Sequence, residues 1–173
     1  MADQAPDSIQ RNLTLPKHIA LIMDGNGRWA SGHGLQREDG HKYGVNSIEN
    51  LIQHMSDVGI QYVTLYAFST ENWNRPKSEV TSIFSLLRST LSNKLERLIE
   101  ANIQVRHIGN LKSINNTTRI AIERAIDATI SNTGMTVIVA INYGGRKEIV
   151  DAVKTIIAAD IKPEEITEAT IEE

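Results

Sequence analysis

Cysteine is absent from the 173 residues of this sequence. A chain without thiols cannot form disulfides, use a thiolate nucleophile or hold zinc or an iron–sulfur cluster through sulfur. An excess of basic charge is absent too, because 18 Lys and Arg residues face 21 Asp and Glu residues, for a formal net charge of −3. We therefore expect no nucleic acid among its partners, and any anionic ligand needs a local cluster of donors.

Long apolar runs are also missing. None approaches the roughly 18–20 residues of a membrane span, and the polar opening, residues 1–10, does not fit a secretory signal. We expect a soluble cytosolic protein. With 40% apolar and 23% charged residues, the composition is typical of one globular domain. Residues 1–15 read as a flexible N-terminal arm, and we expect ordered structure over 16–173.

Short apolar runs alternate with helical periodicities four times. The runs at 18–23, 62–68, 103–108 and 136–142 end in turn residues and predict buried strands. Apolar residues at helical spacing predict helices around 45–55, 80–98, 117–126 and 149–157, with Thr117 and Thr118 as caps of the third. Another helix opening stands at Pro163. The alternation predicts an α/β fold with a mostly parallel sheet covered by helices on both faces. No apolar strand follows residue 163, so we expect its last strands to be missing.

Polar, Gly-rich segments follow these strands. Ligands of open parallel sheets bind beyond the carboxyl ends of the strands, where residues 24–30 (DGNGRWA), 69–75 (STENWNR) and 142–146 (NYGGR) are expected. Gly25 and Gly27 let backbone N–H groups approach an oxyanion, and Arg28 adds forked donors. Asp24 would repel a phosphate unless a cation such as Mg²⁺ lies between them. The alternative to a phosphate-binding segment at residues 24–28 is a Gly-rich turn in which Asp24 is a capping residue.

A dinucleotide-binding fingerprint is a competing interpretation, since Gly25-x-Gly27-x-x-Ala30 fits it formally. Two features argue against it. Glycines at 32, 34 and 40 predict that no helix starts promptly, and no acidic residue closes the second strand. A G-K-[ST] phosphate loop occurs nowhere in the sequence.

Both tryptophans, Trp29 and Trp73, lie in the segments that follow strands. Core packing is one explanation, and an apolar ligand with an anionic head is the other. His18, His54 and His107 fall within predicted strands and helices without metal-binding spacing, so we interpret them as structural.

At residues 18–30 the pattern H-x-A-x-I-M-D-G-N-G-R-W-A is similar to the signature of the cis-prenyltransferases, whose bacterial members are undecaprenyl diphosphate synthases, or isoprenyl transferases. Three further blocks resemble the family in the same order: 37–44 (R-x-x-G-H-x-x-G), 66–76 (YAFSTENWNRP) and 142–146 (NYGGR). The D-D-x-x-D motif of trans-prenyltransferases is absent, in agreement with this resemblance.

The resemblance implies a Mg²⁺-dependent transferase that joins isopentenyl diphosphate repeatedly to an allylic diphosphate, usually farnesyl diphosphate. Asp24 matches the metal-binding catalytic aspartate. Asn72 matches the position that the family labels proton acceptor, and we interpret it as an orienting or relaying group, because an amide is a very weak base. The residues that match substrate-binding positions are Gly25, Asn26, Gly27, Arg28, Trp29, Arg37, His41, Ser69, Thr70, Glu71, Trp73 and Arg75.

Family members continue beyond the region matched here, with further strands, an Arg-rich block for isopentenyl diphosphate, a second metal-binding carboxylate and much of a homodimer contact. The resemblance also implies contact with the inner face of the membrane through the lipid product. We expect residues 1–173 to be the N-terminal portion of such an enzyme and inactive alone. The alternatives are a non-catalytic accessory subunit, which in this family tends to lose the front aspartate loop, and a nucleotide-binding α/β domain.

Overall fold

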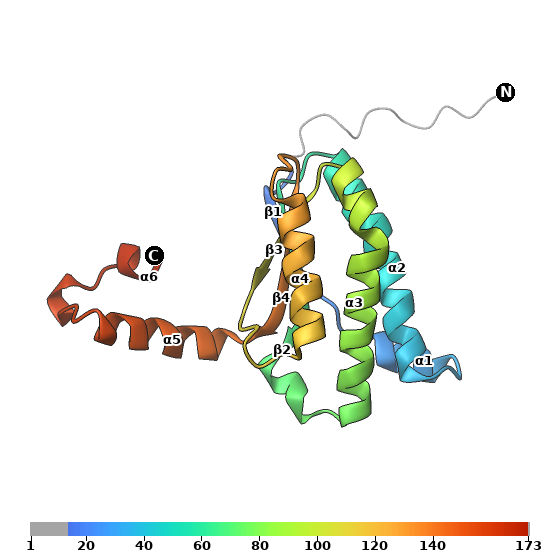
Figure 1. Ribbon diagram of the computed structural model, residues 1–173, viewed down its shortest axis with the longest axis horizontal. Helices are drawn as coiled ribbons and strands as arrows, with labels where there is room; N and C mark the ends of the chain where they lie inside the picture. Colours follow the sequence, from blue (N-terminus) through green and yellow to red (C-terminus); the bar gives the residue numbers. More distant parts are fainter. Residues whose placement is uncertain (1–13, 173) are drawn as a thin grey trace.

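The computed structural model describes residues 14–172, so most of the predicted N-terminal arm lies outside the described residues. Four strands alternate with helices along the chain (Figure 1). The elements are β1 His18–Ile22, α1 Asn26–Gly32, α2 Arg37–Asp57, β2 Tyr62–Ser69, the 3₁₀ helix η1 Thr70–Asn74, α3 Lys77–Glu100, β3 Gln104–Ile108, α4 Asn116–Thr129, β4 Thr136–Tyr143, α5 Gly145–Ala158, the 3₁₀ helix η2 Pro163–Glu165 and α6 Glu168–Glu172.

The strands form one sheet in the order β1-β2-β4-β3, and every neighbouring pair is parallel. Its side chains alternate between two faces, as the period of a strand requires. In β2, Val63 and Leu65 are buried, whereas Tyr62 and Tyr66 are exposed. The parallel sheet flanked by helices that the sequence predicts is confirmed.

Helices α2, α3 and α4 lie on one face of the sheet (Figure 1). The core forms there, from Val63, Val105 and Val137 of the strands and from residues such as Phe84 and Ile122 of the helices. This face confirms the expected helical cover.

The opposite face of the sheet differs from the expectation of cover on both sides. Its residues Ile22, Tyr62 and Tyr66 are exposed. Helix α5 leaves the sheet after β4 and projects away from it (Figure 1). The apolar side chains of α5 therefore do not cover this face in the described part of the chain.

The Gly-rich stretch after β1 is helical, contrary to our prediction that glycines would delay a helix. Helix α1 begins at Asn26, directly after Gly25, whose φ of 90° suits a residue without a side chain. Gly40 and Gly44 lie where α2 crosses α1. A Cβ at Gly40 would stand 2.1 Å from the Asn26 carbonyl oxygen. A Cβ at Gly44 would stand 2.3 Å from the side-chain amide nitrogen of Asn26. These glycines permit close helix packing instead of breaking the helix.

Helix ends show smaller differences. The side chain of Asn115, not of Thr117 or Thr118, caps α4 by accepting a hydrogen bond from the Thr118 N–H at 2.9 Å. The opening at Pro163 is the 3₁₀ helix η2, with the short α6 after it. Among the described residues, no helix is both long and apolar enough to span a bilayer.

Candidate active site

The three predicted ligand-binding segments follow strands that end at the same edge of the sheet. The loop from Asp24 follows β1, η1 follows β2, and α5 follows β4. The register between β2 and β4 shifts around Phe68 and Ser69. Such irregularities re-aim side chains at the ends of strands, and here the chain turns into η1. Parallel topology therefore brings segments distant in sequence to one rim.

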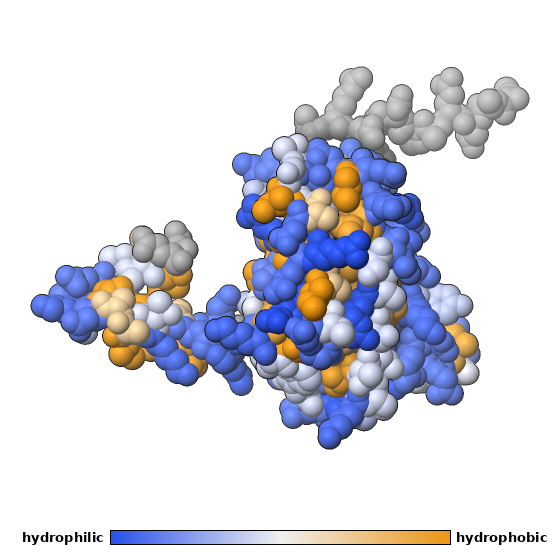
Figure 2. Space-filling model, viewed as in Figure 1, coloured by the Kyte–Doolittle hydropathy of each residue, from blue (hydrophilic) through white to orange (hydrophobic). Residues whose placement is uncertain are grey.

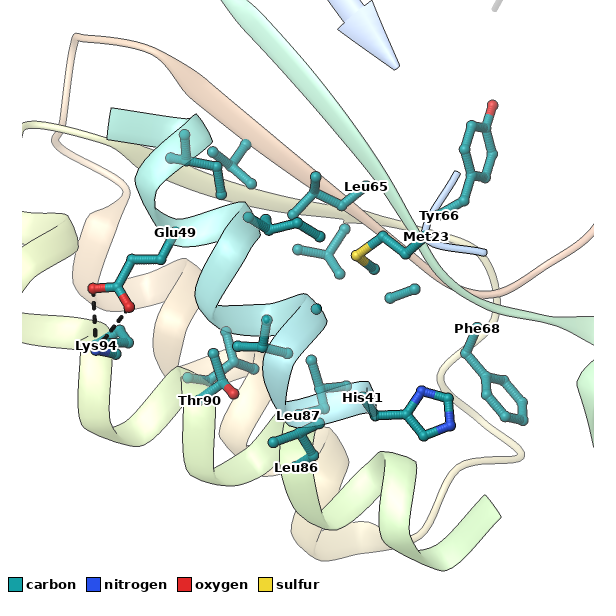
Figure 3. A pocket seen from close by; sticks show the side chains of 18 of the residues that line it. Met23, His41, Glu49, Leu65, Tyr66, Phe68, Leu86, Leu87, Thr90 and Lys94 are labelled. Atoms are coloured by element: carbon teal, nitrogen blue, oxygen red, sulfur yellow. Dashed lines mark hydrogen bonds and ion pairs between the residues drawn. The ribbon is translucent and has the colours of Figure 1, made fainter. Parts of the chain in front are cut away.

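Behind this rim lies a cavity of about 620 Å³ between the sheet and helices α2 and α3 (Figure 3). Aliphatic and aromatic side chains make most of its wall. They include Met23, Val45, Ile48, Ile52, Leu65, Phe68, Ile83, Leu86, Leu87 and Leu91. His41 and Phe68 lie at one end in Figure 3, and Glu49 with Lys94 at the other. The space suits an elongated apolar group.

The predicted site residues divide between the cavity and its surroundings. Six of them line it: Asp24, Asn26, His41, Ser69, Asn72 and Arg75. The other eight lie outside its wall: Gly25, Gly27, Arg28, Trp29, Arg37, Thr70, Glu71 and Trp73. The cavity thus has a polar mouth made by α1, α2 and η1.

Asp24 is an exposed carboxylate at the mouth. It accepts a hydrogen bond from the Gly25 N–H at 2.6 Å and forms an ion pair with Arg28 at 2.9 Å. The described residues contain no group of three or more His, Cys, Asp or Glu side chains arranged to hold a metal. Mg²⁺ is commonly held by one or two carboxylates together with phosphate oxygens and water. Asp24 therefore fits this ion in company with a bound diphosphate.

Glu79, which the sequence analysis missed, lies at the centre of a cluster of basic side chains. Its Oε1 atom lies 2.9 Å from Arg75 Nη1, 3.7 Å from Arg37 Nη2 and 3.7 Å from His41 Nε2. The Glu79 side chain is only 12% exposed. The i,i+4 spacing of Arg75 and Glu79 is the sequence signal that could have identified it.

Two local features concern the basic side chains of this cluster. At Gly27 a Cβ would lie 3.1 Å from Arg37 Nη2, so the glycine lets the guanidinium rest against α1. His41 Nε2 is buried without a hydrogen-bond partner. Buried polar atoms usually have partners, so His41 retains an unused hydrogen-bonding position at the mouth. The cluster can therefore offer guanidinium and imidazole groups to an anion.

Asn72 holds η1 in shape. Its Oδ1 atom accepts a hydrogen bond from the Ser69 N–H at 3.0 Å. The amide oxygen is thereby occupied as an acceptor, a position that favours an orienting role. In the same turn, backbone and Ser69 hydrogen bonds lower the pKa of Glu71, which keeps that carboxylate charged.

Neither tryptophan lines the cavity. The Trp73 indole packs edge-on against Phe68, with ring centroids 5.1 Å apart, and donates its N–H to Asn142 Oδ1 at 2.8 Å. The ring centroids of Trp29 and Tyr43 lie 5.1 Å apart, and both side chains are exposed. The apolar space expected beside the predicted anion site is present, but aliphatic side chains of α2, α3 and the sheet supply it.

Asn142 is a second residue that the candidate set lacked. It has a positive φ of 51°, which asparagine tolerates better than most residues. Its amide nitrogen donates to the Asn110 carbonyl and the Ser113 hydroxyl, both at 2.8 Å. Asn142 therefore ties η1, through Trp73, to the loop after β3.

A family model describing undecaprenyl diphosphate synthase matches residues 22–173. The chain belongs to this prenyltransferase family. Membership also removes the dinucleotide-binding interpretation, although one argument against that interpretation, the delayed helix, was wrong.

Relatives within the family are similar over most of this chain. A (2E,6E)-farnesyl-diphosphate-specific ditrans,polycis-undecaprenyl-diphosphate synthase from Micrococcus luteus is 44% identical over 92% of the chain, and an isoprenyl transferase from Staphylococcus haemolyticus is 50% identical over 82%. The chain covers 66% and 56% of these two relatives, respectively. It therefore spans somewhat less than two thirds of their length.

Solved structures of other family members have the same fold. Lavandulyl diphosphate synthase from Lavandula x intermedia, solved with dimethylallyl diphosphate, gives a TM-score of 0.87 at 34% identity, covering 91% of this chain and 69% of that one. A probable undecaprenyl diphosphate synthase from Campylobacter jejuni gives a TM-score of 0.74 at 31% identity, covering 92% of this chain and 68% of that one. These likenesses agree with the arrangement of sheet, helices and rim described above.

Proposed function

We propose that this chain carries the allylic-substrate site of a cis-prenyltransferase, which condenses isopentenyl diphosphate with an allylic diphosphate such as farnesyl diphosphate. The observation that carries the proposal is one continuous site, in which an apolar cavity opens beside Asp24, His41 and Arg75. A prenyl tail fits the cavity, and a diphosphate fits its polar mouth. The dimethylallyl diphosphate in the lavender structure lends support, because it is an allylic diphosphate.

The side chains at the mouth bind and orient the diphosphate. Arg75 and Arg37 offer forked donors, which match phosphate oxygens in geometry as well as charge. The first backbone N–H groups of α1 lie at the same rim, because α1 begins at Asn26, shortly after β1 ends. His41 contributes its unused ring nitrogen. These donors stabilise negative charge that grows on the departing diphosphate.

Asp24 would hold Mg²⁺ against the diphosphate, and the ion would supply additional charge stabilisation when bound. The apolar wall excludes water from the carbon that loses diphosphate, which protects positive character there from capture by water. Asn72 keeps η1 in the geometry that places Arg75 beside the mouth.

The second substrate needs a cationic site of its own. In the described residues, Arg37 and Arg75 already converge with His41 on Glu79 and serve the first diphosphate. We therefore propose that residues 1–173 alone bind the allylic substrate without transferring it. For the extended enzyme, we also propose homodimeric assembly. We propose that it acts at the cytoplasmic face of the membrane, because a long polyprenyl product is itself a lipid.

The test is a transfer assay on this chain extended by the C-terminal segment of the Micrococcus luteus relative. With Mg²⁺, farnesyl diphosphate and labelled isopentenyl diphosphate, label should enter a cis-polyprenyl diphosphate. The proposed function would be refuted if the extended protein folds and binds both substrates but forms no prenyl product longer than farnesyl diphosphate. The same assay on residues 1–173 should give no product.

A further inference from the structure

Asn142, near the end of β4, is buried and has a backbone conformation that few residues adopt easily. Its φ of 51° lies in the left-handed region. Non-glycine residues in this region often lie at functional sites, where the surrounding contacts hold them in place. The Asn142 amide bonds both to η1 and to the loop after β3, which meet β4 at one end of the sheet (Figure 1).

The chemistry of its partners determines which way the Asn142 amide points. The Trp73 indole N–H can only donate, so the amide oxygen faces it, at 2.8 Å. The Asn110 carbonyl can only accept, so the amide nitrogen faces it, also at 2.8 Å. The same nitrogen donates to the Ser113 hydroxyl. Aspartate would lack the donors and leucine would lack both functions, so these contacts require an amide.

The bond to Trp73 anchors η1 to the rest of the fold. Asn72 bonds to Ser69, which is its neighbour in the same turn. Over residues 14–172, the Trp73–Asn142 bond is the one side-chain hydrogen bond that joins η1 to an element distant in sequence. The Trp73 ring also packs on Phe84 of α3, with ring centroids 5.6 Å apart. Apolar packing is not directional, so the hydrogen bond is the contact that sets the position of η1.

Arg75 depends on this anchor for its place at the mouth of the cavity. It follows η1 directly, two residues after Trp73, and it lines the cavity. Without the bond to Asn142, η1 can take positions in which Arg75 no longer faces the mouth. The apparent affinity of a ligand falls with the fraction of the protein that is competent to bind it. Loss of the anchor should therefore weaken a ligand that Arg75 holds.

We infer that Asn142 is a positioning residue for the allylic diphosphate, because it anchors η1 through the Trp73 indole and so keeps Arg75 at the mouth. The inference rests on the proposed function, since it assumes that a diphosphate binds there. Asn142 lies outside the cavity wall and acts through Trp73. Its influence is confined to the diphosphate head, because the prenyl tail contacts the apolar wall and not η1.

The test is calorimetry of residues 1–173 with farnesyl diphosphate and with farnesol, for Asn142→Gly, Trp73→Phe and the double variant. Glycine tolerates the left-handed backbone and removes the amide. Phenylalanine keeps an aromatic ring and removes the N–H donor. Each single variant should weaken farnesyl diphosphate binding about threefold to tenfold, the range expected for one hydrogen bond. Farnesol binding should not change.

The double variant measures whether the two residues act together. Asn142→Gly and Trp73→Phe remove the same hydrogen bond from its two ends, so their effects on farnesyl diphosphate should not multiply. The double variant should bind this ligand about as tightly as the weaker single variant. Independent roles for the two residues would instead give the product of the two effects.

The matched control is Asn102→Gly. Asn102 also has a left-handed φ, of 54°, and its side chain also bonds to a loop residue, Thr133. It precedes β3 and so lies at the opposite end of the sheet from the mouth. Asn102→Gly should lower the Tm in thermal unfolding and leave both affinities at their wild-type values.

Three results would show that the inference is wrong while the proposed function stands. They are an unchanged affinity of Asn142→Gly for farnesyl diphosphate, equal weakening of both ligands, and single effects that multiply in the double variant. Asn142→Gly also loses the bonds to the loop after β3. If it does not fold, Trp73→Phe decides, and wild-type farnesyl diphosphate affinity in that variant overturns the inference. If farnesyl diphosphate binds the wild-type chain no better than farnesol, the proposed function fails, and the inference fails with it.

Discussion

At the residue scale, the carboxylate of Asp24 at the mouth of the cavity and that of Glu79, which contacts Arg75 and His41, have opposite surroundings. The Asp24 side chain is 74% exposed and has Arg28 as its cationic partner, whereas the Glu79 side chain is 12% exposed and faces Arg37, Arg75 and His41. An exposed carboxylate can join a substrate-bound cation. An enclosed carboxylate can hold cationic side chains in position before an anion arrives. Removal of Asp24 should therefore affect catalysis, and removal of Glu79 should affect the stability of the unliganded protein.

Asp24→Ala in the extended enzyme should reduce kcat far more than it raises the KM for farnesyl diphosphate. A carboxylate that holds Mg²⁺ against a leaving group acts mainly in the transition state, and one such electrostatic group is worth on the order of 10²–10³ in rate. Steady-state kinetics with saturating Mg²⁺ measures both constants. Near-normal kcat in the variant would remove Asp24 from the mechanism.

Glu79→Gln should destabilise the unliganded protein by about 1–2 kcal/mol, because it leaves partly buried cations without their counter-charge. Inorganic diphosphate should restore more stability to this variant than to the wild type, since the ligand supplies the missing negative charge. Thermal unfolding with and without diphosphate measures both effects. Equal ligand-induced shifts in Tm would show that Glu79 does not face the diphosphate site.

At the scale of elements, the strands and long helices could be predicted because apolar periodicity determines them. Helix α1 could not, because glycine both interrupts helices and permits close helix contact, and only the crossing of α1 and α2 distinguishes these uses. Glu79 escaped notice for a related reason. An acidic residue in the first turn of a helix is common, since it complements the helix dipole. Its three partners, Arg37, Arg75 and His41, come together only in the folded chain.

The ion pairs of Glu49 in α2 with Lys94 and Arg97 in α3 should make stability depend on pH. The hydrogen bond from Lys94, reinforced by Arg97, lowers the pKa of Glu49 below its ordinary value of 4.5. A lowered pKa means that the stabilisation is complete above the unfolded-state value and is lost as the pH falls through the folded-state value. Urea unfolding from neutral pH to below pH 4.5 should therefore show a smaller acid-induced loss for Glu49→Gln than for the wild type. Parallel pH profiles would contradict the assignment.

At the scale of the whole molecule, helix α5 carries an apolar stripe away from the core. Its residues Ile149, Val153 and Ile157 are 66%, 47% and 72% exposed, and apolar side chains gather along this helix in Figure 2. The open face of the sheet adds Tyr62 and Tyr66. Contiguous exposed apolar surface favours association.

Residues 1–173 alone should therefore self-associate. Ile157→Glu should shift the protein toward the monomer. Lys154→Glu changes the charge of an exposed residue in the same helix but removes no apolar surface, so it should not shift the protein in this way. Sedimentation velocity across a range of concentrations measures the distribution. A monodisperse monomer at all concentrations would mean that this surface does not drive association.

In the proposed function, one site binds a diphosphate at its mouth and a prenyl tail in its cavity. Calorimetry of residues 1–173 with farnesyl diphosphate and farnesol tests it most directly, because the two ligands share the tail and differ in the head. Two charge-assisted hydrogen bonds are worth about 3 kcal/mol or more together, so farnesyl diphosphate should bind roughly a hundredfold more tightly. Arg75→Gln should reduce this preference, and Arg124→Gln, at an exposed arginine of α4, should leave it unchanged. Equal affinity of the wild-type chain for the two ligands would show that the mouth of the cavity does not bind the diphosphate.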